Sequence, residues 1–265
     1  MTMLKGRIKI KEKYYVRLAV VVVFFVIIGI IYANVLRNNS TIKEIEVDID
    51  YGGKDTLVTS KSIEKLVEAD VPNFRNFSAD EMNRTDIENI VKKNPFIADV
   101  NVSIGISGKL HIEAEQRIPI VRVVQKNKEF YLDNNGYYMP ISSVRNQRVI
   151  MASGYINGGI TDSLHLHGKD TVNNDIYKVY MLANYLINDV KLKDMFDQIY
   201  VCKNKDIELV PKIGNHVVVL GNLENIDEKF ENLFAVYSKG LMSLGWDAYR
   251  KINLKFKNQV VCTKN

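Results

Sequence analysis

The stretch ADVNVSIGISGKLHIEAE, residues 98–115, alternates apolar and polar side chains on both sides of a glycine-containing turn. Before the turn, valine or isoleucine occupies every second position from Val100 onward. After the turn, apolar residues occupy every second position from Leu110 onward, with charged or histidine side chains between them. A period of two places successive side chains on opposite faces of a strand. The stretch therefore predicts an antiparallel hairpin with one apolar face, formed by residues 98–106 and 109–115.

Two short helices are predicted on the amino-terminal side of this hairpin. Residues 60–69 carry apolar side chains three and four positions apart, which is the spacing of one helix face. A second helix is expected to begin at residues 85–88, which have the Thr-x-x-Glu form of a capping box; residues 78–81 have the Ser-x-x-Glu form. Pro95 ends the second helix, because the residue before a proline avoids the helical conformation. The two apolar faces consist of Ile63, Leu66 and Val67, and of Ile87, Ile90 and Val91.

A further strand is predicted at residues 42–51. From Ile45 to Asp50, isoleucine and valine alternate with acidic side chains, and Gly52 and Gly53 follow as a turn. The order is then strand, helix, helix, strand, strand over about 75 residues, a length sufficient for a small core. Two amphipathic helices on one face of a three-stranded sheet bury the apolar faces of both layers, so we expect an α+β fold.

A membrane-spanning helix is predicted before this domain. Residues 18–33 contain no charged side chain, and the flanking residues extend the apolar segment to 14–36, so that a helix here reaches the ~20 residues needed to cross a bilayer. Residues 1–17 carry six basic residues against one acidic residue, which equals the whole formal charge of +5. Because basic flanks stay on the cytoplasmic side, we expect a cytoplasmic tail at 1–17, a single-pass anchor at 18–36 with lipid contacts over 14–36, and the remaining chain outside the cytoplasm.

Two other interpretations of the apolar segment fit it less well. A cleaved signal peptide has an apolar part of about 7–15 residues and a small-x-small cleavage site, to which residues 33–35 are a poor match. A buried core helix of a soluble domain normally has a polar face, and this segment is apolar all round.

The composition beyond the membrane segment argues against several classes of function. Outside residues 1–17 the basic and acidic residues balance, so no basic patch suggests nucleic-acid binding. We find no phosphate-binding glycine loop, no nucleophile elbow and no His-Glu-x-x-His motif. We therefore expect no catalytic residue, no cofactor, no metal and no small-molecule substrate.

Histidine and cysteine give no strong signal for a site. His165 and His167 would share one face of a strand, but no carboxylate or cysteine stands at ligand spacing, which favours a solvated strand face over a metal site. Cys202 and Cys262 could pair in an oxidising compartment. They are better interpreted as two small buried apolar side chains, and the sequence leaves the pairing open.

The second half of the chain, residues 119–265, alternates helices and strands. Residues 130–140 form a predicted hairpin whose Asn-Gly step suits a tight turn. The other expected elements are a helix at 174–190, strands at 207–210 and 216–220, a helix at 226–244 and a closing strand segment at 249–261. The predicted apolar stripes are Ile176, Val179, Ala183, Leu186, Ile187 and Val190 in the first helix, and Phe230, Leu233, Phe234, Tyr237 and Leu241 in the second.

The order of these elements after a membrane anchor resembles a POTRA domain followed by the second domain of the FtsQ/DivIB family. Four stretches carry the resemblance: NPFIADVNV (residues 94–102), LHIEAEQRIPIV (110–121), FYLDNNGYYMP (130–140) and INLKFKN (252–258), with Leu-Gly closing a strand pair at 220–221. Asn253 and Phe256 depart from the family's usual acid and tyrosine, and the domain boundary is one residue longer than the family pattern. The resemblance implies a POTRA domain (β-α-α-β-β) at 40–118 and a mixed α/β domain with a largely antiparallel sheet at 119–265.

The resemblance also implies a function without catalysis. Proteins of this family are bitopic scaffolds of the cytoplasmic membrane at the division septum, where they bind the FtsB/DivIC and FtsL proteins and help control septal peptidoglycan synthesis. Other interpretations are a membrane-anchored POTRA assembly factor of a transport or secretion system, and an anchored extracytoplasmic enzyme such as a transpeptidase, for which no nucleophile signature is present.

The closing segment is the candidate binding site. If it lies at the edge of a sheet, its unpaired backbone groups can accept a partner strand. On the predicted strand, Ile252, Leu254 and Phe256 share one face. The lysines on the other face suit an acidic partner, although they also suit simple solubility, and the resemblance favours binding. The predicted partner-binding residues are Tyr249, Lys251, Ile252, Asn253, Leu254, Lys255, Phe256 and Lys257.

Overall fold

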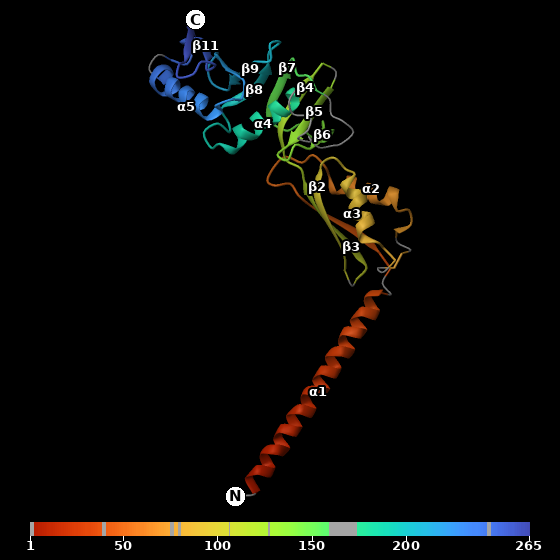
Figure 1. The fold of residues 1–265 in the computed structure, drawn as a ribbon. Coiled ribbons are helices and arrows are strands. Elements are labelled where there is room, and N and C mark those ends of the chain that lie inside the picture. Colours follow the sequence, from red (N-terminus) through yellow and green to blue (C-terminus); the bar gives the residue numbers. More distant parts are fainter. Residues whose placement is uncertain are drawn as a thin grey trace. The chain divides into compact units, whose positions relative to one another are not determined.

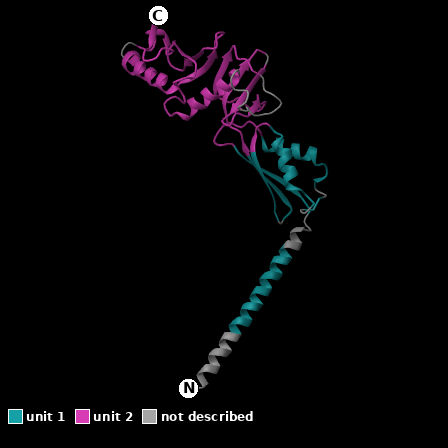
Figure 2. Ribbon diagram, viewed as in Figure 1, with its two compact units in different colours: residues 1–50, 59–94, 99–114 teal, residues 51–58, 95–98, 115–265 magenta. Residues whose placement is uncertain are grey.

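The computed structural model describes residues 3–38, 41–74, 77–78, 81–105, 107–126, 128–158, 174–242 and 245–265. A long helix, α1 (Met3–Asn38), precedes two domains of mixed helix and strand (Figure 1). The chain divides into two compact units, which are coloured in Figure 2. The first contains residues 1–50, 59–94 and 99–114, and the second contains residues 51–58, 95–98 and 115–265.

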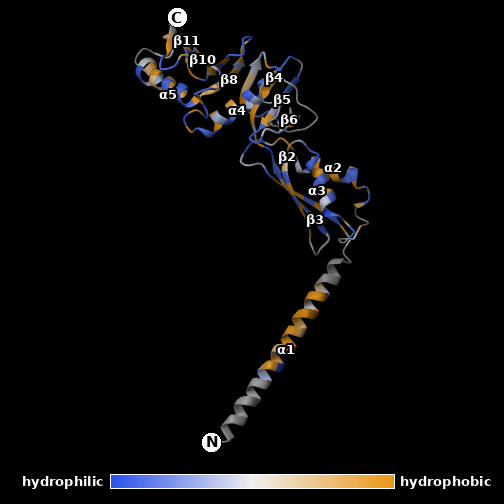
Figure 3. Cartoon of the chain, viewed as in Figure 1, coloured by the Kyte–Doolittle hydropathy of each residue, from blue (hydrophilic) through white to orange (hydrophobic). Residues whose placement is uncertain are grey.

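Helix α1 contains the predicted membrane segment. Its residues Tyr14–Ala33 have a mean hydropathy of 2.8 and none of their side chains is buried by the protein. Figure 3 shows most of this part of α1 in the apolar colour, with hydrophilic colour near its amino-terminal end. Among the described residues, it is the one helix long and apolar enough to cross a membrane. Apolar side chains on every face of a helix are stable in lipid but not in water, so the structure is consistent with a single-pass anchor. The orientation of the anchor stays a prediction.

The first domain has the predicted order of elements and an α+β fold, in which two helices accompany one sheet. Its three-stranded sheet has the order β1-β3-β2, and α2 packs against β1 and α3. The buried side chains of the two helices include Ile63, Val67, Ile87 and Val91, as the periodicity predicts. The elements are β1 (Glu44–Asp50), α2 (Ser60–Asp70), α3 (Arg84–Lys92), β2 (Ile97–Ile104) and β3 (Lys109–Gln116).

The helix caps differ from the predicted ones. Helix α3 begins at Arg84, and the side chain of Asn83 accepts a hydrogen bond from the backbone N–H of Thr85 at 3.1 Å. The predicted capping box at Thr85 is therefore wrong, because an asparagine two residues earlier satisfies the free N–H groups equally well. The carboxylate of Glu81 does accept from the N–H of Ser78 at 2.9 Å, and this bond lowers the pKa of Glu81. Helix α2 begins with a capping box between Thr59 and Ser62, which was not predicted.

The second domain is built on a nine-stranded sheet of order β12-β11-β10-β9-β8-β7-β4-β5-β6. Three neighbouring pairs are parallel, namely β4–β7, β7–β8 and β10–β11, and the other five are antiparallel, so the expected largely antiparallel sheet is confirmed. Its strands are β4 (Pro119–Gln125), β5 (Lys128–Asp133), β6 (Tyr138–Pro140), β7 (Ile150–Gly154), β8 (Phe196–Val201), β9 (Ile207–Pro211), β10 (Val217–Gly221), β11 (Tyr249–Asn253) and β12 (Val261–Lys264).

Two helices make the crossovers that parallel strands require. Helix α4 (Asp175–Asn188) connects β7 to β8. Helix α5 (Ile226–Val236), continued by one π-helical segment, η3 (Tyr237–Leu241), connects β10 to β11. Buried side chains of both helices belong to one hydrophobic core with those of the sheet, which places both on the same face (Figure 1).

Several expectations for the second domain were incomplete. Helix α4 ends at Asn188, and Val190, which was expected on its apolar stripe, is 95% exposed. Strands β4, β7 and β8 were not predicted. The predicted hairpin at 130–140 is present, with Gly136 at φ 78° as the Asn-Gly step requires. His165 and His167 lie outside the described residues.

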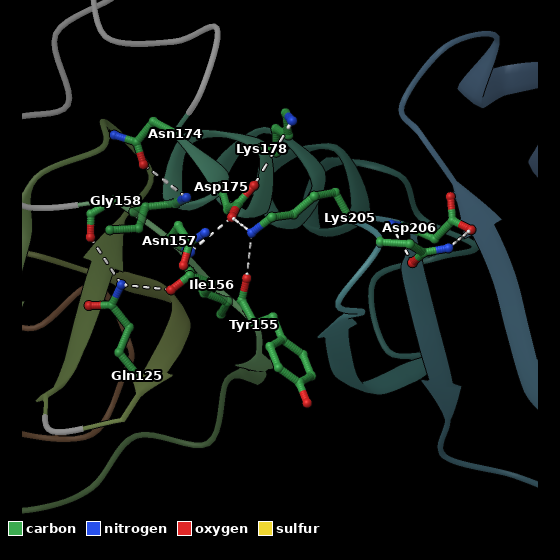
Figure 4. A network of polar contacts seen from close by, with 12 residues as sticks. Gln125, Tyr155, Ile156, Asn157, Gly158, Asn174, Asp175, Lys178, Lys205 and Asp206 are labelled. Atoms are coloured by element: carbon green, nitrogen blue, oxygen red, sulfur yellow. Dashed lines mark hydrogen bonds and ion pairs between the residues drawn. The ribbon is translucent and has the colours of Figure 1, made fainter.

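A polar network fixes the start of α4 to the ends of β7 and β8 (Figure 4). The Asp175 carboxylate is buried; it accepts from the backbone N–H of Asn157 at 2.8 Å and from the ammonium group of Lys205 at 2.6 Å. Lys205 also donates to the carbonyl of Tyr155 at 2.8 Å. The side chain of Asn174 caps the helix by accepting from the N–H of Ile176. A buried carboxylate with all its partners in place holds the crossover helix in register with two strands.

The segment 51–58 packs into the second unit rather than the first. The Leu57 side chain is buried with Tyr131 and Met139. Its backbone N–H donates to the Gln116 side chain at 2.6 Å, and its carbonyl accepts from the Ser142 hydroxyl at 2.8 Å. Both backbone groups of the buried residue are therefore satisfied. The second unit thus includes residues 51–58, which come well before the predicted domain boundary near residue 118. That boundary stays a prediction.

Substituting Asp175→Ala is expected to lower the free energy of unfolding by about 2 kcal/mol, because it removes the side-chain acceptor of the Asn157 N–H and the anionic partner of the Lys205 ammonium, which keeps its bond to the Tyr155 carbonyl. Urea unfolding of the full chain, followed by the fluorescence of its one tryptophan, measures this. Lys178→Ala is the control. Its ammonium lies 4.0 Å from the same carboxylate and is well exposed, so it should change stability by less than about 0.5 kcal/mol. Equal effects of the two substitutions would contradict this assignment.

Substituting Leu57→Ala is expected to destabilise the second unit by about 3 kcal/mol through the cavity it leaves beside Tyr131 and Met139. The same unfolding measurement tests it. Val144→Ala, at a side chain that is 49% exposed, should change the midpoint little. An unchanged midpoint for Leu57→Ala would show that segment 51–58 does not belong to this core.

Candidate partner-binding edge of the sheet

The sheet of the second domain ends at β12, and this edge is the candidate site. Strand β12 pairs on one side with β11, and among the described strands none pairs with its other side. Strand β11 is paired on both sides: Lys251 lies opposite Val217 of β10 and opposite Thr263 of β12. Residues 249–253 are therefore not the edge of the sheet, so β11 does not meet the condition on which strand addition was expected; the assignment of the eight residues to partner binding stays a prediction. A turn with Asn258 in the left-handed conformation (φ 57°) reverses the chain and places 261–264 outside β11.

The predicted binding residues consequently have different surroundings. Ile252 and Leu254 are buried in the main core, and the N–H of Leu254 donates to the carbonyl of Val219 at 2.9 Å. Phe256, which was expected to share their face, lies in the turn and is 52% exposed. A strand that ends at Asn253 no longer keeps the period of two, which explains the difference.

Two of the predicted lysines are paired within the protein. The ammonium of Lys251 lies 3.0 Å from the Glu208 carboxylate, and that of Lys255 lies 2.6 Å from Asp206. The Lys255 contact lowers the pKa of Asp206. Lys257 is exposed and has no ion pair among the described residues. Because Lys251 already faces a carboxylate of β9 and Lys255 faces the carboxylate just before β9, both are poor contacts for an acidic partner.

An apolar groove of about 620 Å³ lies on the same domain, along the carboxyl-terminal part of α5 and η3. Met242 is 76% exposed and Trp246 is 37% exposed, which is unusual for side chains of this size. Single π-helical turns are common at functional sites, and here Tyr237 at the start of η3 lines the groove. The lining residues are Lys191, Phe234, Ala235, Tyr237, Ser238, Met242 and Trp246.

A buried histidine supports the floor of this groove. The Nε2 atom of His216 lies 2.8 Å from the hydroxyl of Tyr237, and the Tyr237 ring packs edge-on against Trp246 with ring centroids 5.3 Å apart. Burial lowers the pKa of His216, an effect that the carbonyl of Trp246 partly offsets, and burial raises the pKa of Tyr237. The His216 imidazole and the Tyr237 hydroxyl are therefore both neutral at pH 7. The hydrogen bond between them fixes the Tyr237 ring, against which Trp246 packs.

The groove and the edge strand adjoin each other. The side chain of Asn265, directly after β12, donates to the carbonyl of Asp247 at 2.5 Å, and Asp247 follows Trp246. The ring of Tyr249, on β11, packs close to η3: its Cε2 atom lies 4.0 Å from the point where a Cβ atom would stand if Gly240 had one. We call β12 together with the groove residues Phe234, Tyr237, Met242 and Trp246 the edge-and-groove site.

The described residues hold no group of three or more side chains suited to bind a metal. Cys202 and Cys262 are free thiols, and burial raises the pKa of each. Cys202 follows β8 and Cys262 lies on β12, four strand spacings or about 19 Å away, whereas a disulfide needs Cα atoms within about 7 Å. The two cysteines therefore do not pair in this fold.

The sequence did not predict two parts of this site, strand β12 and the apolar groove. Strand β12 is only four residues long and has no clear alternation. Met242 lies within the predicted helix but off its apolar stripe, and Trp246 lies after the predicted end of that helix. The one tryptophan of the chain, which stands outside every predicted apolar stripe, was the sequence feature that could have indicated an apolar surface here.

Comparison with known proteins agrees with this architecture. Residues 40–115 match a family model described as a POTRA-like domain, and residues 118–263 match one described as FtsQ/DivIB, C-terminal related. The chain is also 25% identical, over 193 residues, to the cell division protein DivIB of Clostridium tetani (strain Massachusetts / E88); this match covers 69% of the chain and 68% of the relative. The FtsQ/DivIB model alone matches more than half of the chain, and it follows one apolar helix and a POTRA-like domain. The chain therefore belongs to the FtsQ/DivIB family of cell division proteins.

Proposed function

We propose that this protein is a bitopic, non-enzymatic scaffold of the division machinery that recruits a partner by adding a strand to β12. The observation that carries the proposal is the open side of β12, whose outward N–H and C=O groups have no strand beside them in the described structure. An added strand satisfies these groups through main-chain hydrogen bonds, each worth about 1 kcal/mol net.

The adjoining groove supplies the specificity that main-chain pairing lacks. An apolar side chain placed beside Met242 and Trp246 would gain roughly 1.5–3 kcal/mol by burial. The partner segment should therefore combine an extended stretch with one large apolar residue. Phe256 and Lys257, exposed in the turn before β12, are further candidate contacts.

The partners we propose are the membrane proteins of the FtsB/DivIC and FtsL type that the family resemblance implies. With the basic tail in the cytoplasm and the two domains outside, all of these chains would share one membrane. A shared membrane raises their effective concentration, so that a modest affinity is sufficient for assembly. In this role the protein would act at the septum and influence peptidoglycan synthesis by positioning other proteins.

Proline substitutions at Cys262 and Thr263 test strand addition. Along an edge strand the N–H groups of adjacent residues point alternately toward the neighbour and outward. One of the two substitutions therefore removes only an outward donor and leaves the pairing with β11 intact. The variant that keeps the wild-type unfolding curve is expected to bind a purified DivIC-type partner at least about tenfold more weakly, as measured by calorimetry. If that variant binds with full affinity, strand addition at β12 is wrong.

Met242→Glu tests the groove. Because Met242 is 76% exposed, the substitution should leave stability unchanged and weaken partner binding by about fivefold to tenfold. Met181→Glu is the matched control, since Met181 is another exposed methionine, on α4, that does not line the groove. Equal affinities of the two variants would exclude the groove from the interface.

A further inference from the structure

A second cavity of about 460 Å³ lies in the second unit where three parallel strands begin. Strands β4, β7 and β8 run parallel, so their amino-terminal ends lie at the same edge of the sheet, and helix α4 ends there after its crossover. Ile120, Ile150 and Phe196, one from each strand, line the cavity together with Leu186 and Ile187 of α4. Its volume lies in the range of ligand-sized sites.

The cavity combines an apolar floor with a positive rim. Lys54, Arg148 and Lys193 line it, are exposed, and have no ion pair among the described residues. The fourth cation of the lining, Lys212, lies 3.4 Å from the Asp194 carboxylate. The other acidic residue of the lining is Asp197. Three unpaired cations against one unpaired carboxylate make the cavity attractive to an anionic group.

The apolar floor is continuous with the main core. Leu186, Leu192 and Phe196 are almost fully buried members of the core that also line the cavity, while Ile150 and Ile187 are half-buried. The half-buried isoleucines form an apolar surface next to the charged rim. Covering that surface would release water from it at a gain of roughly 25 cal/mol per Å².

We propose that this cavity docks a short acidic segment of a partner protein, which inserts one aliphatic or aromatic side chain flanked by carboxylates. The three unpaired cations come from three separate parts of the chain: the segment 51–58, the stretch before β7 and the loop after α4. Positive charge spread over three segments matches carboxylates distributed along a peptide. A lipid-like amphiphile, in contrast, concentrates its anionic charge in one head group and would leave most of the rim unpaired.

This docking cavity is separate from the edge-and-groove site and does not depend on it. The loop after α4 contributes Lys191 to the groove and Lys193 to the cavity, with the buried Leu192 between them. The two sites therefore share this loop but are lined by different residues of it. A scaffold with both sites occupied holds two segments at once, from one partner or from two.

The test is a selection of peptides against the full chain in lipid nanodiscs, using phage-displayed random dodecapeptides. Enriched peptides are synthesised, and their affinity is measured by fluorescence anisotropy. We expect sequences with two or more acidic residues beside a leucine, isoleucine or phenylalanine. The triple variant Lys54→Glu, Arg148→Glu, Lys193→Glu should weaken their binding by about tenfold or more. Ile187→Glu, which places a carboxylate at the floor, should do the same.

The control variant Lys61→Glu, Lys65→Glu, Lys128→Glu changes the same charge at three exposed lysines that do not line the cavity, and should alter affinity by less than about twofold. Of Cys262→Pro and Thr263→Pro, the variant that keeps the wild-type unfolding curve should bind the selected peptides normally, which separates this site from β12. The proposal is overturned if no peptide is enriched, or if the triple variant binds the enriched peptides as well as the control does. It is also overturned if dodecyl phosphate binds the wild-type chain in a manner abolished by Ile187→Glu while no acidic peptide does.

Discussion

An open β-sheet always leaves two rows of backbone hydrogen-bonding groups without a neighbouring strand, and the binding edge that we propose depends on how the two edge strands of the nine-stranded sheet differ. At one end, β6 has three residues and finishes at Pro140, which has no N–H to donate. At the other end, β12 has four residues and no proline. The first edge is therefore a poor template for a further strand, and the second remains available. This asymmetry favours β12 over β6 as the proposed docking edge.

The two crossover helices explain why each cavity lies where it does. A parallel pair of strands needs a connection that returns over the face of the sheet, and both α4 and α5 pack on the same face. The cationic cavity lies at the carboxyl-terminal end of α4, where residues of β4, β7 and β8 also line it, and the apolar groove lies along the end of α5 and its π-helical extension. Topology thus produces two concave sites of different chemistry on one layer.

Local pattern predicted the elements whose apolar spacing is regular, and long-range pairing decided the rest. The hairpin of β2 and β3 and helix α2 alternate or repeat cleanly, so they were found. Strands β4, β7 and β8 lie inside a mixed sheet and lack a clean period of two, as buried parallel strands usually do. The position of β12 outside β11 depends on a four-residue strand after a polar turn. The partners of Lys251 and Lys255 lie more than 40 residues away in sequence, and no local rule finds them.

The two lysine pairs change what the binding edge should prefer. Exposed ion pairs such as Lys251–Glu208 and Lys255–Asp206 contribute little to stability, about 0–1 kcal/mol each. Their effect is to cancel charge next to the edge, so a partner strand meets a nearly neutral surface there. Attraction at β12 must then come from main-chain hydrogen bonds and from apolar contact in the groove, neither of which weakens strongly with salt. The unpaired cations lie instead around the cavity at the end of α4, where attraction should decrease as ionic strength rises. Salt dependence therefore distinguishes the two sites on physical grounds.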